Sequence, residues 1–304
     1  MQTVNHISMP RRASPPAEVD VTESLVRALL EEQHPDLASL PLTAAGAGWD
    51  NALFRLGDSF AVRLPRRAVA EPGLLNEQRW LPQLAPRLPL PVPAAVRLGV
   101  PGCGYPWSWS VTPWFEGRVI EGPTLGHKAA TTLGRFLAAL HVPAPSDAPV
   151  SPFRSVALAS RDERLRSNVA DLEGIVDGGR VLSCWDEWRR ATPWAGPPLW
   201  VHGDLHPYNV LVSGDDFAAV IDFGDVCAGD PAVDLAAGWM LFAAAARATF
   251  RAAYRQEAVD DEQLWIRARG WALVLNLVWL VQAADDEPTT RQTLATIEGL
   301  VGGD

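Results

Sequence analysis

Apolar residues in the first fifth of the chain change their spacing along the sequence. Residues 22–33 carry Leu25, Leu29 and Leu30 at helical spacing, which predicts a helix with Thr22 or Asp20 as its cap. From residue 40 onward the apolar residues form short extended runs, separated by the glycine-containing stretch 45–51 and by Gly57-Asp58-Ser59. Short runs between turn residues predict a three-stranded antiparallel meander. Its strands are expected at 40–43, 52–56 and 60–64.

One helix and two further strands follow. Leucines at helical spacing predict a helix within residues 69–88. The proline-rich segment 89–93 must be extended and leads into runs at 95–100 and 107–114 that have the composition of strands. Five strands and a helix therefore make up the first part of the expected fold.

The rest of the chain shows mostly helical spacing. The exception is a pair of β-branched runs, 210–212 and 217–221, on either side of Ser213-Gly214-Asp215-Asp216, which predicts a hairpin. Helices are expected at 124–140, 161–175, 183–190, 232–246, 260–284 and 289–300. The fold class is therefore α+β. Residues 1–20 contain several prolines and no periodicity, so we expect a disordered leader there.

Composition narrows the class of protein. The chain has 304 residues, 48% of them hydrophobic, which is enough for a sizeable core. Its net charge of −10 argues against a nucleic-acid partner and leaves room for a cationic substrate. We expect no apolar run long enough to span a bilayer, and the N-terminus lacks the apolar core of a signal peptide, so a cytoplasmic protein without a membrane partner is expected. Three scattered cysteines indicate neither a disulfide framework nor a zinc site.

Three polar residues are brought together by the predicted hairpin. If Val212 faces Phe217 across the turn, Asn209 at the start of one strand lies near Asp222 at the end of the other, and Asp204 lies in the loop that enters the hairpin. Two carboxylates and an amide oxygen are hard ligands that suit Mg²⁺, which usually takes one or two carboxylates together with substrate phosphates. The alternative is that these residues only cap a turn and a strand end.

The sequence His-Gly-Asp-x-x-x-x-Asn at 202–209, followed by Ile-Asp-Phe-Gly at 221–224, resembles the catalytic core of the aminoglycoside phosphotransferase family, which has a bilobal protein-kinase-like fold. The resemblance implies that Asp204 is the catalytic base and that Asn209 and Asp222 hold Mg²⁺ against the phosphates of ATP or GTP. It also implies an N-terminal nucleotide-binding lobe at 21–115 and a C-terminal catalytic and acceptor-binding lobe at 116–304.

The resemblance implies further nucleotide contacts in the first lobe. Gly46 and Gly48 are expected in a turn where the backbone approaches a phosphate, although glycines also make ordinary turns. The only lysine of the chain is Lys128, so Arg63 occupies the place of the usual phosphate-binding lysine, and an arginine can bind phosphate through its planar fork. Its expected partner is Glu77, with Glu71 the weaker choice. The backbone of Thr112 and Trp114 is expected to meet the purine edge.

The resemblance makes His202, Asp230 and Asp234 structural, with Asp230 capping a helix and Asp234 bracing the catalytic loop. The short distance in sequence from Asp222 to this helix favours a small acceptor over a peptide. Asp285, Asp286 and Glu287 form an acidic cluster that either binds amino groups of the acceptor or is only a helix end.

The expected activity is therefore transfer of the γ-phosphate to a hydroxyl group of a small cationic molecule, with an aminoglycoside as the leading acceptor. A macrolide, a choline- or sugar-like alcohol and a catalytically silent relative are the alternatives. The protein is expected to be a monomer or a homodimer.

Overall fold

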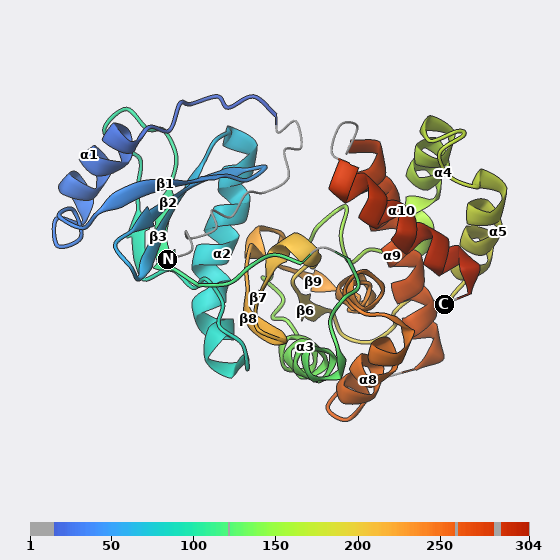
Figure 1. Ribbon diagram of the computed structural model, residues 1–304. Helices are drawn as coiled ribbons and strands as arrows, with labels where there is room; N and C mark the ends of the chain where they lie inside the picture. Colours follow the sequence, from blue (N-terminus) through green and yellow to red (C-terminus); the bar gives the residue numbers. More distant parts are fainter. Residues whose placement is uncertain (1–14, 121, 259–260, 283–286, 304) are drawn as a thin grey trace.

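The computed structural model describes residues 15–120, 122–258, 261–282 and 287–303. They form two lobes (Figure 1). The N-terminal lobe holds one antiparallel sheet in the order β1-β2-β3-β5-β4. Its elements are α1 (Glu23–Gln33), β1 (Leu42–Ala47), β2 (Asn51–Leu56), β3 (Phe60–Pro65), α2 (Glu71–Leu84), β4 (Arg97–Gly99) and β5 (Trp109–Pro113). The expected meander and the two later strands are confirmed, and Thr22 caps α1.

The first strand differs from its predicted position. It begins at Leu42 and continues to Ala47, through residues that we expected in a turn, and Gly46 lies within it. The register of β1 on β2 shifts between Ala44 and Gly46, and Gly46 has a φ of 120°. A bulge explains this, because glycine tolerates the positive φ that the extra residue requires.

Helix α2 connects the two lobes. Its middle and C-terminal part, including Trp80, Leu81 and Leu84, belongs to the core of the C-terminal lobe, and the Trp80 ring lies 5.0 Å from that of Trp200. At its beginning, Gly73 lies so close to the chain after the hairpin that an added Cβ would be 2.9 Å from the Gly224 carbonyl oxygen. The first turns of α2 therefore pack against the residues that follow Asp222.

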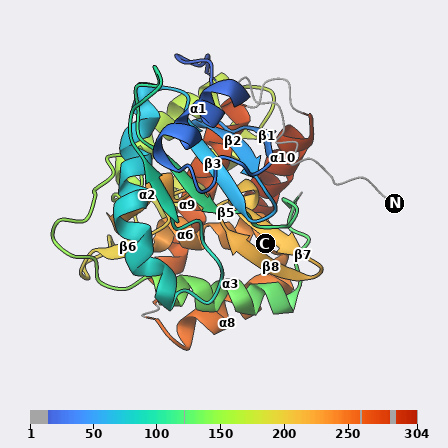
Figure 2. The ribbon, with the colours of Figure 1, turned by 90° about the vertical axis from the view of Figure 1, so that its left-hand side faces the viewer.

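The C-terminal lobe is mostly helical, and Figure 2 shows it beneath the sheet of the N-terminal lobe. Its hairpin, β7 (Val210–Ser213) and β8 (Asp216–Val220), has Val212 opposite Phe217, as expected. A second pair joins β6 (Leu199–Val201) to β9 (Cys227–Gly229). The helices are α3 (His127–Leu140), α4 (Asp162–Asp171), α5 (Gly178–Trp188), α6 (Ala232–Leu235), α7 (Ala237–Leu241), α8 (Ala244–Arg255), α9 (Glu262–Gln282) and α10 (Glu287–Gly302).

The prediction of a single helix at 232–246 was wrong. The segment is divided into α6, α7 and the start of α8, and Phe242, which is extended with φ −129° and ψ 136°, separates α7 from α8. Its ring is fully buried and packs against Phe217 and Phe250. No glycine or proline marks this break, so tertiary packing overrides the local helical pattern.

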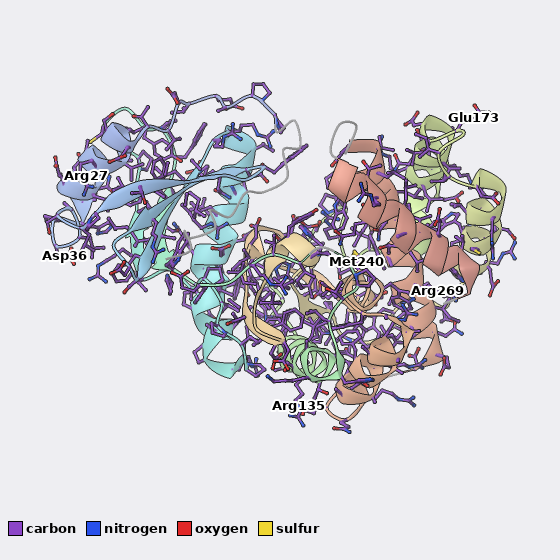
Figure 3. All side chains as sticks on the ribbon, viewed as in Figure 1. Arg27, Asp36, Arg135, Glu173, Met240 and Arg269 are labelled. Carbon is purple, nitrogen blue, oxygen red and sulfur yellow. The ribbon has the colours of Figure 1, made fainter. Side chains whose placement is uncertain are left out.

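Helix α9 corrects the expectation about apolar runs. By length and composition alone this helix of 21 residues could cross a membrane, since an 18-residue window within it has a mean hydropathy of 1.3, yet 78% of that window is buried within the fold. Its hydrophobicity is therefore that of a central core helix. Figure 3 shows the side chains packed around this part of the lobe, with Met240 in the interior and Arg135 and Glu173 at the periphery.

Candidate active site

The hairpin brings Asn209 and Asp222 to the same end. The Ile221 N–H donates to the Asn209 carbonyl oxygen at 2.9 Å, which continues the pairing of β7 and β8 by one residue. Asn209 is 4% exposed, whereas the Asp222 side chain is 49% exposed and open to a ligand. The backbone of Asp222 has a φ of 63°, a left-handed conformation that aspartate and asparagine tolerate better than most residues.

Asp204 is held from two sides. Nη2 of Arg154 lies 2.7 Å from its Oδ1, and Nε2 of His206 lies 3.3 Å from its Oδ2. Nδ1 of His206 accepts the Tyr208 N–H at 3.2 Å, so Nε2 carries the proton and donates. Burial would raise the pKa of Asp204, but Arg154 and His206 outweigh it and hold that pKa well below its usual value. Asp204 is therefore an ionised carboxylate at neutral pH.

The residues present fit a magnesium ion. Nδ2 of Asn209 donates to the Asp204 carbonyl oxygen at 2.8 Å, which turns Oδ1 of Asn209 outward as a ligand. Asp222 supplies one carboxylate. The described residues contain no cluster of three or more His, Cys, Asp or Glu suited to a metal. One amide and one carboxylate oxygen are the donor set expected of Mg²⁺ that also binds substrate phosphates, rather than of a metal enclosed by protein ligands.

Arg63 forms a buried ion pair with Glu77. Nη1 of Arg63 lies 2.5 Å from Oε1 of Glu77, and its Nη2 lies 3.2 Å from Oδ1 of Asp222. Oε2 of Glu77 also accepts the Phe223 N–H at 3.1 Å. Burial raises the pKa of Glu77, although the positive charge of Arg63 opposes this rise. Burial lowers the pKa of Arg63, but Glu77 and Asp222 together raise it by more, so the pKa of Arg63 lies above its usual value. The pair places a fixed guanidinium next to Asp222.

Buried acidic residues support the catalytic loop. The carboxylate of Asp234 accepts the His202 N–H at 2.7 Å and the Gly203 N–H at 2.9 Å, and it also contacts Nε2 of His141 at 3.1 Å. Nε2 of His202 meets the Ile221 carbonyl oxygen at 3.0 Å. These contacts fix the backbone of His202 and Gly203, directly before Asp204.

Asp230 has two partners. It accepts the Ala232 N–H at 3.0 Å, at the start of α6. Its carboxylate also pairs with the buried Arg267 of α9, with Nε 2.7 Å from Oδ2. Both contacts are consistent with a role in holding α6 in place.

Gly203 carries the first of our predictions. Its φ is 83°, and an added Cβ would lie 2.5 Å from the Asp225 carbonyl oxygen. We expect Gly203→Ala to lower the free energy of unfolding by about 2 kcal/mol or more, measured by urea denaturation. Gly214→Ala is the control, because Gly214 also has a positive φ, of 63°, but nothing lies within 4 Å of its added Cβ. Equal losses in both variants would show that the contact with Asp225 has no effect.

The two glycines of the first turn have different positions. Gly48 lines the cavity beside Asp204, but Gly46 is exposed within β1 and is not part of the lining, so the expectation that both lie in a turn over the phosphates was wrong for Gly46. Arg66 donates to the Gly48 carbonyl oxygen at 3.2 Å, and Arg67 pairs with Asp50 at 2.6 Å. These two arginines hold the turn that begins at Gly48.

The expected purine contacts also need correction. The Trp114 N–H donates to the Ser59 carbonyl oxygen at 2.8 Å, and Thr112 pairs with Ala61 in the same ladder. Both residues therefore direct their backbone groups toward β3. Successive residues of a strand alternate in this direction, so Pro113 and Phe115 direct theirs the opposite way. All four residues line the cavity, so the direction of the backbone groups is what separates the two pairs.

Part of the expected acceptor site lies outside the described residues. Asp285 and Asp286 belong to that part, and Glu287 is described only as the first residue of α10. Two acidic residues of α4 and α5, Asp162 and Asp186, pair with the neighbouring Arg166 and Arg189. They do not line the cavity beside Asp204.

A cavity of about 850 Å³ joins these groups. It extends from Gly48 and Arg63 in the N-terminal lobe, past the strand end at Pro113, to Asp204, Asn209 and Asp222. On the far side of Asp204 it is lined by residues 149–154 and by Val278, Trp279 and Gln282 of α9. Arg154 belongs to this lining, and no pattern in the sequence had marked it.

Comparison with known proteins agrees with this geometry. The sequence profile of the phosphotransferase enzyme family (APH) matches residues 41–271, which is most of the chain. Comparison with curated proteins found no match.

Similar solved structures share the fold. The GDP complex of wild-type aminoglycoside 2'-phosphotransferase-IIIa has a TM-score of 0.67 at 17% identity, covering 93% of this chain and 99% of that one. Macrolide 2'-phosphotransferase type I has a TM-score of 0.61 at 22% identity, and the match covers 91% of this chain and 98% of that one. The apoenzyme of macrolide 2'-phosphotransferase MphH from Brachybacterium faecium has a TM-score of 0.57 at 20% identity, covering 90% and 97%. With its family profile, its kinase-like α+β fold and its cleft between two lobes, the chain belongs to the phosphotransferase enzyme family and is a phosphotransferase that acts on a hydroxyl group.

Proposed function

We propose that this phosphotransferase moves the γ-phosphoryl group of ATP or GTP, with Mg²⁺, to a hydroxyl group of a small cationic molecule, with an aminoglycoside as the leading acceptor. The observation that carries the proposal is the convergence of Asp204, Asn209, Asp222 and Arg63 on one cavity of about 850 Å³. A cavity of this size has room for a nucleotide together with part of an acceptor.

The nucleotide is expected on the side of the N-terminal lobe. Arg63 remains charged and presents a planar donor fork to phosphate oxygens, and Glu77 keeps that fork in position. Oδ1 of Asn209 and the carboxylate of Asp222 would hold Mg²⁺, which neutralises phosphate charge when bound. The Pro113 carbonyl oxygen and the Phe115 N–H are the candidates for the purine edge, because both residues line the cavity and direct their backbone groups away from β3.

Asp204 is the group that receives the acceptor hydroxyl. In the transfer step the acceptor oxygen forms a bond to the γ-phosphorus, while the bond from that phosphorus to the β–γ bridging oxygen breaks. The bridging oxygen leaves with its electron pair on the nucleoside diphosphate, and the hydroxyl proton passes to Asp204. Because the pKa of Asp204 is held low, its main contribution is to orient the hydroxyl and to accept its proton as the new bond forms.

A macrolide is the second candidate acceptor, and one observation favours it. Val150 is 79% exposed and Phe153 is 64% exposed, and both line the cavity, as does Trp279. Exposed apolar side chains at a cavity mouth suit a ligand with an extended apolar face. A polycationic aminoglycoside would instead depend on carboxylates such as those of the acidic cluster at 285–287.

One experiment tests the activity and identifies the acceptor. Purified protein is incubated with Mg²⁺ and ATP or GTP, and release of nucleoside diphosphate is measured across aminoglycosides, macrolides and small amino alcohols. We expect release to depend on one acceptor class and to require Asp204. Nucleotide binding without release for any acceptor would contradict the proposal and favour a catalytically silent relative.

A further inference from the structure

We propose that Arg154 is a positioning residue for the transfer step, fixing the carboxylate of Asp204 in the plane in which it meets the acceptor hydroxyl. The inference rests on the proposed function and adds to it a residue outside the catalytic motif. Arg154 lies fifty positions before Asp204, in the loop between α3 and α4, and its Nη2 is 2.7 Å from Oδ1 of Asp204.

The loop that carries Arg154 is anchored at both ends. Oγ of Ser151 accepts the Arg154 N–H at 3.0 Å, which forms a local turn. Before the turn, the Pro149 carbonyl oxygen accepts the Ala228 N–H at 2.9 Å. After it, Oγ of Ser155 donates to the Asp230 carbonyl oxygen at 2.7 Å.

Gly229 permits this close approach. A Cβ at this position would lie 2.6 Å from the Ser155 carbonyl oxygen. The loop around Arg154 therefore packs directly against the segment that follows the hairpin, and this packing gives the Arg154 side chain a defined position.

The guanidinium and one imidazole together determine how the carboxylate lies. Arg154 donates to Oδ1 of Asp204 and His206 to Oδ2, so rotation of the carboxylate would break both contacts. Each carboxylate oxygen keeps a second lone pair for a further donor. The acceptor hydroxyl can therefore approach Asp204 without displacing Arg154, in an orientation that Arg154 has already set.

The surroundings of Arg154 favour a role in the reaction over a purely structural one. Its second carboxylate partner is Asp225, with Nε 3.7 Å from Oδ2, and Arg154, Asp204 and Asp225 all line the cavity. The fold itself is braced elsewhere, by Asp234 beneath the catalytic loop and by the buried pair of Asp230 and Arg267. An arginine that lines a cavity and pairs there with two carboxylates of the same lining is suited to orienting a reacting group.

The test compares Arg154→Met, Arg154→Lys and Arg154→Ala with the wild type, using the acceptor identified by the panel. We expect Arg154→Met to lower kcat by about 100-fold, because misplacing a reacting group by about 1 Å has an effect of this size, while the KM for the nucleotide stays within about threefold. Arg154→Lys should recover part of the loss. Added guanidinium, far below denaturing concentrations, should restore part of the activity of Arg154→Ala. Arg97→Met is the control, because Arg97 belongs to an exposed ion pair with Asp36, away from the cavity.

The outcomes separate this inference from the proposed function. An active wild type with an unchanged kcat in Arg154→Met would overturn the positioning role alone. Thermal unfolding verifies that Arg154→Ala is folded. If this folded variant lost activity, added guanidinium restored none of it and Arg154→Lys was equally inactive, the positioning role would also be overturned. Absence of transfer by the wild type with every acceptor would overturn the proposed function, and the role of Arg154 with it.

Discussion

Asp204→Ala is expected to lose about 100- to 10,000-fold in kcat, the range that a positioned acid–base group contributes, with little change in nucleotide affinity. The physical reason is that Asp204 is the ionised carboxylate that the cavity presents on its acceptor side, between Arg154 and His206. The contacts to nucleotide and Mg²⁺ that we propose for Arg63, Asn209 and Asp222 do not depend on the side chain of Asp204. Steady-state release of nucleoside diphosphate gives kcat, and titration with a fluorescent nucleotide gives the affinity.

The control for this variant is Asp58→Ala. Asp58 is a fully exposed carboxylate in the turn between β2 and β3, outside the cavity, and should leave kcat unchanged. Thermal unfolding of Asp204→Ala checks that the loop survives, since Arg154 keeps Asp225 as a partner at 3.7 Å. Wild-type turnover in a folded Asp204→Ala protein would exclude Asp204 as the group that receives the hydroxyl.

Asp222→Asn is expected to lower kcat/KM for the nucleotide by about 100- to 1,000-fold, and to raise the Mg²⁺ concentration needed for half-maximal activity. The substitution removes one negative charge from the proposed metal site but keeps the side-chain shape. It is also compatible with the left-handed backbone at this position, where φ is 63°. Activity as a function of Mg²⁺ concentration is the measurement.

The matched control for the metal site is Asp216→Asn, on the same hairpin. Asp216 contacts Thr132 and lies outside the cavity, so its variant should show the Mg²⁺ dependence of the wild type. The unfolding temperature of Asp222→Asn should change little, because the Asp222 side chain is half exposed and Arg63 retains its pair with Glu77. An unchanged Mg²⁺ requirement in Asp222→Asn would argue against this residue as a ligand.

The order of elements followed largely from local patterns. The strands at 51–56 and 60–65 are short β-branched or aromatic runs between clear turn residues, and their positions were predicted to within a residue. The turn between β7 and β8 places Val212 opposite Phe217, so the proximity of Asn209 and Asp222 could be predicted from the sequence. The bulge that shifts the register by one residue between Val212 and Leu211, and so places Asn209 opposite Ile221, could not. Sequence patterns failed where burial decides the conformation, as at Phe242, which divides a segment that has a continuous helical pattern.

Some parts of the candidate site could likewise be predicted from the sequence, and others could not. Arg63 and Glu77 could be paired from the sequence, because one lies on a strand and the other on the helix after it, and the family resemblance placed them together. The purine contact could not be assigned to single residues, because the direction of each backbone group in β5 depends on its pairing with β3. Arg154 gave no signal, since a lone arginine in a loop has no periodicity and its partner is fifty residues away.

Local sequence patterns predicted which polar groups meet in this protein, namely two carboxylates and an amide at fixed spacing around a hairpin, although not the bulge that shifts the register of that hairpin. Short-range geometry is sufficient for that, because neighbouring residues can meet through only a few turn conformations. Only the tertiary structure decided what surrounds these groups. The close packing of α2 against Gly224, the anchoring of the loop at Arg154 and the burial of α9 arise from packing between segments far apart in the chain. Contacts of that kind depend on the summed burial of many side chains, which no local pattern encodes.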